Sequence, residues 1–246
     1  MSGPHQGAAA PALLAARGVE RVFDGGRVPA LRGVDFDVAA GECVAIVGPS
    51  GCGKTSLLHL LGALDRPTAG EVFFRGEPLS RFRDLAVFRA RRVGFVFQAC
   101  HLLPTLTALE NVEVPMFERE WPARRRRERA ALLLEAVGLR DRLRHRPAQL
   151  SGGERQRAAI ARSLANEPDV LLADEPTGNL DSGTARRVLD LMKSIHREQG
   201  MAMVIVTHDP GVAAQADRVI RMLDGRIETP WDGAAAGSAD DAHQAR

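Results

Sequence analysis

The chain has 246 residues, a length that one hydrophobic core with an inserted subdomain can support. Hydrophobic residues make up 45% of the sequence and charged residues 26%, which excludes disordered, collagen-like and small disulfide-framework classes. The net charge is only +2, so charge does not indicate a nucleic-acid partner, and no apolar stretch reaches the roughly 18 residues of a membrane span. The three cysteines lack metal-ligand spacing and are too few for a disulfide framework, which favours a reducing cytosol.

The first part of the chain predicts a tail, an antiparallel layer and then a strand that leads into a helix. Residues 1–15 carry no signal-peptide pattern and are expected to form a disordered tail. Short apolar or alternating runs at residues 19–23 and 34–38, with Gly25 and Gly26 between them, predict strands of an antiparallel layer. The continuous apolar run at residues 43–47 (CVAIV) is typical of a buried strand, and a glycine-rich turn and a helical pattern follow it.

That turn reads GPSGCGKT at residues 48–55 and matches the phosphate-binding P-loop pattern. Glycines let the backbone N–H groups point inward, and the next helix adds the positive end of its dipole, so β- and γ-phosphates can be held there. Lys54 supplies a positive charge between those phosphates, and the Thr55 hydroxyl is a suitable Mg²⁺ ligand. The alternative is a glycine-rich turn without a ligand. The expected contacts are Gly48, Pro49, Ser50, Gly51, Cys52, Gly53, Lys54, Thr55 and Ser56.

Two more buried strands are predicted beyond a helical insertion. Residues 105–145 hold two helical patterns separated by a proline and an arginine cluster, RRRRER at residues 124–129, which we interpret as a solvated face. The strand at residues 170–173 ends in Asp174 and Glu175, and the strand at residues 203–206 ends in Thr207 and His208. Polar residues at the carboxyl ends of parallel strands predict that the chemistry lies at this edge of the sheet.

Asp174 and Glu175 suit two different tasks at such an edge. A carboxylate at the end of a buried strand can hold Mg²⁺ directly or through water, so this role is predicted for Asp174. Glu175 beside it is predicted to accept the proton of the water that attacks the γ-phosphate. The alternative is that the pair simply opens a loop.

Several motifs in chain order carry a resemblance to a known family. The segment LSGGERQ at residues 150–156 resembles the signature motif of ABC-transporter ATPases. Gln98 after the strand GFVF resembles the Q-loop of that family, residues 179–181 (NLD) its D-loop, and His208 in THD its H-loop. Longer segments, among them ADEPTGNLDS, resemble the MacB/LolD/FtsE group of these ATPases.

The resemblance implies roles for residues around the phosphates. Gln98 would contact Mg²⁺ or the attacking water, His208 the γ-phosphate, and Asp181 the second site across a dimer. Phe23 lies where the family has an aromatic residue that stacks on adenine, with a core phenylalanine as the alternative. The residues expected to take part in hydrolysis are Lys54, Gln98, Glu175 and His208, and the expected Mg²⁺ ligands are Thr55, Gln98 and Asp174.

The resemblance also implies that two subunits pair head to tail. Ser151, Gly152, Gly153 and Glu154 of one subunit would then cover the γ-phosphate held by residues 51–56 of the other. Ser151 followed by Glu154 is also a capping box, so a plain helix start is the structural alternative, and the two readings are compatible.

The fold class expected from this resemblance is α/β, a P-loop NTPase (RecA-like) core with an N-terminal antiparallel β-subdomain and an inserted α-helical subdomain. The expected organisation is a tail at 1–15, an ATPase domain at 16–228, and a mobile tail at 229–246. Within the domain, residues 16–98 and 166–228 would form the core with its β-subdomain, and residues 99–165 the helical subdomain.

The expected function is ATP binding and Mg²⁺-dependent hydrolysis that drives a separately encoded membrane permease. The expected partners are that permease and a second copy of the chain or a homologous ATPase subunit, without nucleic acid. The chain would lie in the cytoplasm at the membrane face, attached through the permease only. Leu102, Leu103 and Leu106 are candidates to receive a permease helix, or else pack the subdomain core. An FtsE-like mechanotransmission ATPase and a soluble ABC protein acting on ribosomes or DNA are the alternatives.

Overall fold

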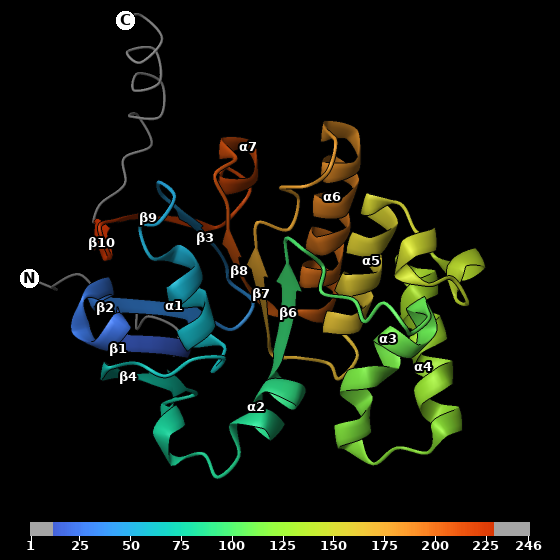
Figure 1. The fold of residues 1–246 in the computed structure, drawn as a ribbon, viewed down its shortest axis with the longest axis horizontal. Coiled ribbons are helices and arrows are strands. Elements are labelled where there is room, and N and C mark those ends of the chain that lie inside the picture. Colours follow the sequence, from blue (N-terminus) through green and yellow to red (C-terminus); the bar gives the residue numbers. More distant parts are fainter. Residues whose placement is uncertain (1–11, 229–246) are drawn as a thin grey trace, which may run out of the picture.

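The structure is a computed structural model that describes residues 12–228 (Figure 1). Residues 12–15, expected in the N-terminal tail, instead belong to strand β1 (Ala12–Phe23), because Leu14 is fully buried against the core and pairs with β2 and β4. That part of the tail prediction is therefore wrong. The rest of the expected N-terminal tail and the whole expected tail at 229–246 lie outside the described residues.

The central sheet has six strands and carries the predicted α/β pattern. Its order is β10 (Arg226–Glu228), β9 (Arg218–Leu223), β3 (Cys43–Val47), β8 (Ala202–Val206), β7 (Val170–Asp174) and β6 (Val93–Phe97). All neighbouring pairs are parallel except β10 with β9. The carboxyl ends of β3, β6, β7 and β8 therefore lie at one edge of the sheet (Figure 1).

A second sheet is antiparallel, as the runs at residues 19–23 and 34–38 predict. Its order is β2 (Val28–Ala39), β1, β4 (Ala69–Phe74) and β5 (Glu77–Pro78), and the short 3₁₀ turn Asp24–Gly26 joins β1 to β2. Gly25 and Gly26 both have positive φ there, which accounts for two glycines at this connection.

Helices cover both faces of the central sheet. They are α1 (Lys54–Leu61), α2 (Leu85–Arg92), α3 (Ala108–Glu113), α4 (Ala123–Ala136), α5 (Gly152–Ser163), α6 (Ser182–Gln199) and α7 (Pro210–Ala213). Short 3₁₀ segments lie at Leu79–Arg81, Val114–Arg119, Arg140–Arg142 and Pro147–Gln149. The first helical pattern of the insertion, at residues 106–117, forms α3 and then a 3₁₀ segment. Pro115 ends the α-helix because it lacks the N–H that an α-helix would use.

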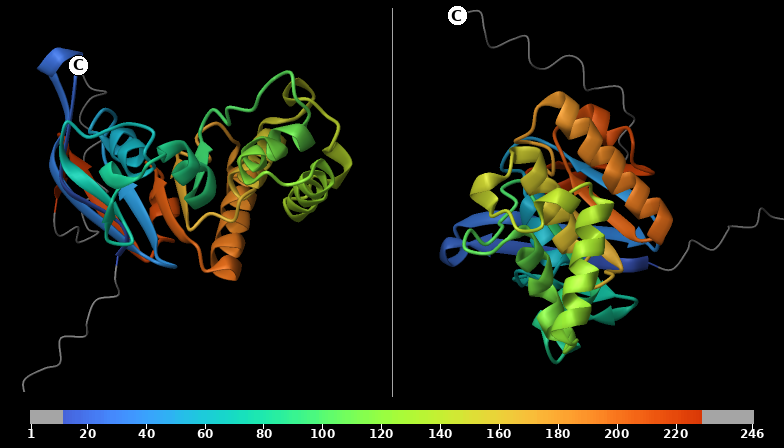
Figure 2. Two further views of the ribbon diagram at one scale, coloured as in Figure 1. Left: turned by 90° about the horizontal axis from the view of Figure 1, so that it is seen from below. Right: turned by 90° about the vertical axis from the view of Figure 1, so that its right-hand side faces the viewer.

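Two hydrophobic clusters lie on opposite faces of the six-stranded sheet. Neighbouring residues of one strand alternate between them: Leu172 of β7 packs with α1 and the antiparallel sheet, whereas Leu171 packs with α3 to α6. Helices α3, α4 and α5 form a group at the end of the molecule away from the antiparallel sheet (Figure 2). The P-loop helix and the signature segment are thus attached to different faces of one sheet.

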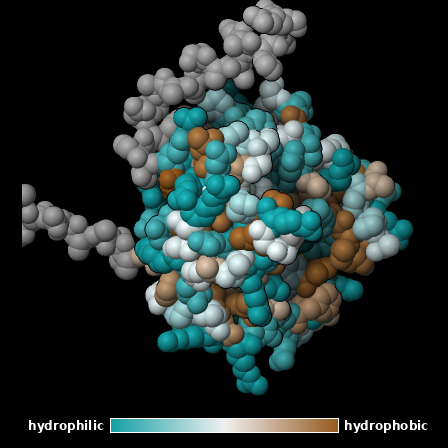
Figure 3. All heavy atoms as spheres, turned by 60° about the vertical axis from the view of Figure 1, so that its left-hand side comes forward, coloured by the Kyte–Doolittle hydropathy of each residue, from teal (hydrophilic) through white to brown (hydrophobic). Residues whose placement is uncertain are grey.

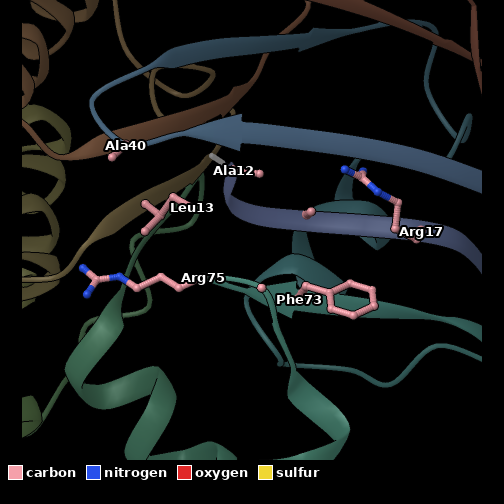
Figure 4. Close-up of a pocket in the computed structure, with 8 residues that line it drawn as sticks. Ala12, Leu13, Arg17, Ala40, Phe73 and Arg75 are labelled. Carbon is pink, nitrogen blue, oxygen red and sulfur yellow. The ribbon is translucent and has the colours of Figure 1, made fainter. Parts of the chain in front are cut away.

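The surface of the described residues is mixed in polarity and carries a hollow apart from the predicted site residues. On the face seen in Figure 3, hydrophobic side chains lie in separate areas among hydrophilic ones. A hollow of about 660 Å³ beside the antiparallel sheet is lined by Leu13, Arg17, Phe73 and Arg75, among others, and by none of the predicted site residues (Figure 4). Among residues 12–228, none of the helices combines the length and apolar character that crossing a bilayer requires.

Candidate functional site

The phosphate loop connects β3 to α1 and is held in a conformation that only glycine permits. Gly48 and Gly53 have φ of 150° and 104°. A Cβ atom on Gly48 would lie 2.2 Å from the carbonyl oxygen of Met222, and one on Gly53 would lie 2.4 Å from that of Ala30. Backbone atoms cannot give way as a flexible side chain can, so the loop packs against β9 and β2 only with glycine at these positions.

Lys54, the first residue of α1, is buried within the loop. Its ammonium group donates hydrogen bonds to the carbonyl oxygens of Gly48 (2.7 Å) and Pro49 (2.8 Å), and the Cys52 sulfur lies 3.8 Å away. A buried ammonium needs such partners. The carbonyl contacts thus keep the charge inside the loop.

Thr55 and Asp174 come together at the carboxyl edge of the sheet. The Thr55 hydroxyl donates to the Asp174 carboxylate, with 3.0 Å to Oδ2 and 3.3 Å to Oδ1. Burial raises the pKa of the Asp174 carboxyl, and the hydrogen bond from Thr55 opposes this increase. The structure therefore joins the two residues that the P-loop and strand motifs separately predict as Mg²⁺ ligands.

Glu175 and His208 form a second close pair next to Asp174. His208 Nδ1 lies 3.2 Å from Glu175 Oε1, and the Glu175 N–H donates to the carbonyl of Val206, so β7 and β8 present both side chains together. Glu175 has a backbone φ of 43°, in the left-handed region that residues other than glycine rarely adopt. This backbone conformation turns the chain sharply just after the strand, and the contact with His208 helps to place the carboxylate.

Gln98 follows β6 and contacts the loop after β7. Its side-chain Nε2 donates to Oδ1 of Asn179 (3.3 Å), and Asn179 Nδ2 donates to the carbonyl oxygen of Gln98 (3.2 Å). Gln98 and Asn179 line a cavity of about 590 Å³ together with Thr55 and Asp174. The motifs place Asn179 in the D-loop but give it no contact with Gln98. The two residues lie 81 positions apart, so sequence spacing does not predict their pairing.

The signature segment begins α5, and its capping box is confirmed. The Ser151 hydroxyl accepts from the Glu154 N–H (3.2 Å), while Glu154 Oε2 accepts from the Ser151 N–H (2.8 Å). Arg142 also donates to Glu154 (3.0 Å). A Cβ on Gly153 would lie 2.3 Å from Thr184 Cγ2 at the start of α6, so the glycine allows the two helix starts to approach.

Two further predicted residues lie at the ends of elements. Asp181 caps α6, because its Oδ1 accepts from the N–H of Thr184 (3.0 Å). Hydrogen bonding to the Thr184 side chain, and then to its backbone, lowers the pKa of the Asp181 carboxyl. Phe23 ends β1 and is 37% exposed, with the Arg21 guanidinium 4.5 Å from its ring centre. Phe23 is therefore not a core phenylalanine, and the Arg21 guanidinium covers one face of its ring.

Most of the predicted residues form one group, and the signature segment lies apart from the P-loop. At the carboxyl edge lie the P-loop, Gln98, Asp174, Glu175 and His208. Ser151 and its neighbours lie across the sheet from α1, as the positions of α1 and α5 in Figure 1 show. No hydrogen bond or ion pair joins residues 151–154 to residues 48–56 in the described part of the chain.

Comparison with known proteins identifies relatives over most of the chain. Residues 31–178 match the family model described as ABC transporter. An uncharacterized ABC transporter ATP-binding protein of Thermotoga maritima is 55% identical over 214 residues, which is 85% of this chain and 91% of that protein. The lipoprotein-releasing system ATP-binding protein LolD 2 of Caulobacter vibrioides is 51% identical over 88% of this chain and 96% of its own length.

Other relatives agree with this result. The macrolide export ATP-binding/permease protein MacB of Nitrosomonas europaea is 48% identical over 88% of this chain, which corresponds to 34% of MacB. Among solved structures, a dimeric ATP-binding cassette in a post-hydrolysis state with bound ADP and phosphate has a TM-score of 0.81 and 41% identity, covering 87% of this chain and 96% of that one. The predicted P-loop NTPase fold and the resemblance to the MacB/LolD group are confirmed, and the chain belongs to the ABC transporter family as an ATP-binding subunit similar to LolD and MacB.

Proposed function

We propose that this chain binds and hydrolyses ATP with Mg²⁺, pairs head to tail with a second copy or a homologous subunit, and drives a separately encoded membrane permease. The observation that carries the proposal is the convergence of Lys54, the Thr55–Asp174 pair and the Glu175–His208 pair at one edge of the sheet. A phosphate cradle, oxygen ligands and a base are the parts that phosphoryl transfer to water requires.

The residues present fit a magnesium ion. Thr55 and Asp174 offer hydroxyl and carboxylate oxygens 3.0 Å apart, and Gln98 lines the same cavity. Oxygen atoms of this kind are the ligands that a hard cation prefers. When bound, the ion would neutralise charge on the β- and γ-phosphates. Thr55, Asp174 and Gln98 would hold it, while Lys54 would contact the phosphates from within the loop.

Glu175 is the proposed general base. Its carboxylate accepts from His208 when the imidazole Nδ1 carries a proton, at the 3.2 Å separation of these two atoms. The proposed role of Glu175 is to take the proton of the attacking water, while His208 holds that water and the γ-phosphate in line. The contact with His208 supports this role, because it restrains the Glu175 carboxylate beside Asp174.

The proposed dimer follows from the separation of the two phosphate-facing motifs. Since α1 and α5 cover opposite faces of the sheet, the signature segment of one chain would serve the P-loop of another. The dimeric relative with bound ADP and phosphate supports this arrangement. Under this proposal Ser151, Gly152 and Gly153 would contact the γ-phosphate of the partner subunit's nucleotide.

A permease partner is supported by the relatives and by one exposed leucine. LolD relatives are named for lipoprotein-releasing systems, and the MacB relative is named as a combined ATP-binding/permease protein. Leu103 is 46% exposed, whereas Leu102 packs against the helical cluster, so of this pair Leu103 is the one available to a partner. We propose that the chain lies at the cytoplasmic face of the membrane, attached through the permease only.

Nucleotide binding is tested with Lys54→Ala. Removing the ammonium group should weaken ATP binding by at least about tenfold and abolish hydrolysis, because the charge acts on the bound ground state as well as on the transition state. Affinity is measured with a fluorescent ATP analogue, and the melting temperature checks folding. Unchanged ATP affinity in the folded variant would rule out the assigned role of Lys54.

Docking to the permease is tested with Leu103→Asp. We expect the basal ATPase activity of the isolated subunit to stay within about twofold of wild type while the complex with the permease is lost, because a charge cannot enter an apolar contact without a partner. Leu132→Asp is the matched control, since Leu132 on α4 is also exposed, at 66%. Retention of the complex by Leu103→Asp would place the docking surface elsewhere.

A further inference from the structure

We propose that Asn179 is a positioning residue that holds the Gln98 side chain at the wall of the metal and phosphate cavity. The inference rests on the proposed ATPase function, and it assigns to the D-loop asparagine a task that the family motifs do not give it. Asn179 would act through Gln98 and would not itself touch the nucleotide.

The contact between the two residues has two points. Asn179 accepts from the Gln98 side-chain amide (3.3 Å) and donates to the Gln98 backbone carbonyl (3.2 Å). One asparagine therefore restrains both the main chain and the side chain of Gln98. A single hydrogen bond would leave the long glutamine side chain free to rotate about it, whereas the second bond fixes the position of Asn179 relative to the backbone.

The main chain after Gln98 is fixed independently by α5. Cys100 and His101 both have left-handed φ, 59° and 44°, which two consecutive residues other than glycine rarely adopt. Arg162 holds this conformation by donating to the carbonyl oxygens of Cys100 (2.7 Å) and His101 (2.5 Å). Gln156 adds a bond from its side chain to the Phe97 carbonyl (3.4 Å).

Contacts from α5 anchor the backbone of this loop on both sides of Gln98. They leave the Gln98 side chain unrestrained. A Cβ atom on Gly178 would lie 2.7 Å from Gln98 Nε2 and 3.3 Å from Glu175 Oε2. Glycine at this position therefore allows the amide of Gln98 to lie beside the loop that carries Glu175. Asn179, the next residue, supplies the bonds that keep it there.

The same asparagine connects Gln98 to the loop that would face a partner subunit. Asn179 lies two residues before Asp181, whose carboxylate caps α6. A displacement of this short loop when two subunits close would move Asn179, and the amide of Gln98 would move with it. Under the proposed dimer, this arrangement would connect the subunit contact to the proposed Mg²⁺ ligand Gln98.

The first test is Asn179→Ala in the full chain, with steady-state ATPase measurements over a range of Mg²⁺ concentrations. We expect kcat to fall about tenfold and the Mg²⁺ concentration for half-maximal rate to rise several-fold, with KM for ATP within about twofold, because the P-loop is intact. Asn179→Asp, which keeps the acceptor but loses the donor, should give an intermediate effect. Ser194→Ala on α6 is the control and should behave as wild type.

The second test is the double variant with Gln98→Ala. If Asn179 acts through the Gln98 side chain, Asn179→Ala should lower kcat less than about twofold further in that background. The full tenfold loss there, or a wild-type Mg²⁺ requirement in both Asn179 variants, would overturn the inference. A wild-type chain without ATPase activity would instead refute the proposed function, and the inference would fall with it.

Discussion

Burial controls the chemistry of Cys43 at the start of β3, the strand that leads into the phosphate loop. The side chain is 5% exposed, and its burial, with a smaller contribution from Asp217, raises the pKa of the thiol to about 11. The neutral thiol is thus the form that the folded core accepts. Cys100 behaves in the same direction, since burial also raises the pKa of its thiol.

This shift predicts a loss of stability in alkali. Because the pKa is higher in the folded than in the unfolded chain, stability is unaffected below about pH 9 and falls as pH rises from 9 to 11, by about 2 kcal/mol from this one group. Urea unfolding of wild type and Cys43→Ala at pH 8 and pH 11 measures the difference. An equal decrease in the free energy of unfolding of both proteins would contradict the assigned shift.

At the residue scale, the motifs predict which side chains are used but not all of their contacts. The P-loop pattern requires glycine at positions 48 and 53. In the structure, the carbonyl oxygens of Met222 and Ala30 leave no room for a Cβ atom at these two positions. Those carbonyls are far away in sequence, as is the partner of Gln98, Asn179. A pattern of spacings carries no information on contacts that arise only when distant segments pack together.

At the element scale, Ser151 caps α5 and is proposed to contact a partner's nucleotide, and substitution can separate these two tasks. Ser151→Ala removes the cap of α5 and should cost about 1 kcal/mol of stability together with most of the ATPase activity. Ser151→Asp keeps a good cap but brings a negative charge toward the γ-phosphate of the partner subunit's nucleotide, so it should keep the stability and lose the activity.

The control for this comparison is Asp84→Ala. Asp84 caps α2 through the N–H groups of Ala86 and Val87, away from the proposed site, so its loss should lower stability by a similar amount without changing kcat. Thermal unfolding and ATPase rates of the three variants give the result. ATPase activity at the wild-type level in Ser151→Asp would leave capping as the only role of Ser151.

Strands and helices with strong patterns are predictable from the sequence, and weakly patterned ones are not. The runs at 43–47, 170–173 and 203–206 are continuous and apolar because helices cover both faces of the central sheet. Strand β4 begins with Ala69 and Gly70, and β9 contains two arginines, so neither sequence shows a continuous apolar strand pattern. Alanine and leucine alone do not distinguish a strand, so the sequence predicts a tail at residues 12–15 where the structure has the start of β1.

At the scale of the whole molecule, the order of the motifs predicts the family and the fold, while the relation between its parts needs the structure. The helical group of α3 to α5 is joined to the core by the loop after Gln98, and Arg162 and Gln156 clamp that loop. The signature segment at the start of α5 thus belongs to the same group of helices that Leu103 precedes in the chain. Under the proposed function, this group of helices would carry closure around ATP to the permease.

The central claim, that two chains close head to tail around ATP, is tested most directly by the mass of Glu175→Gln. The amide cannot accept the proton of the water, so this variant should bind ATP but hydrolyse it at least about a hundredfold more slowly. Light scattering after size exclusion with Mg²⁺ and ATP should then show twice the chain mass of 26.6 kDa, and a single-chain mass without nucleotide or with Ser151→Asp added. A single-chain mass for Glu175→Gln at saturating ATP would contradict the account.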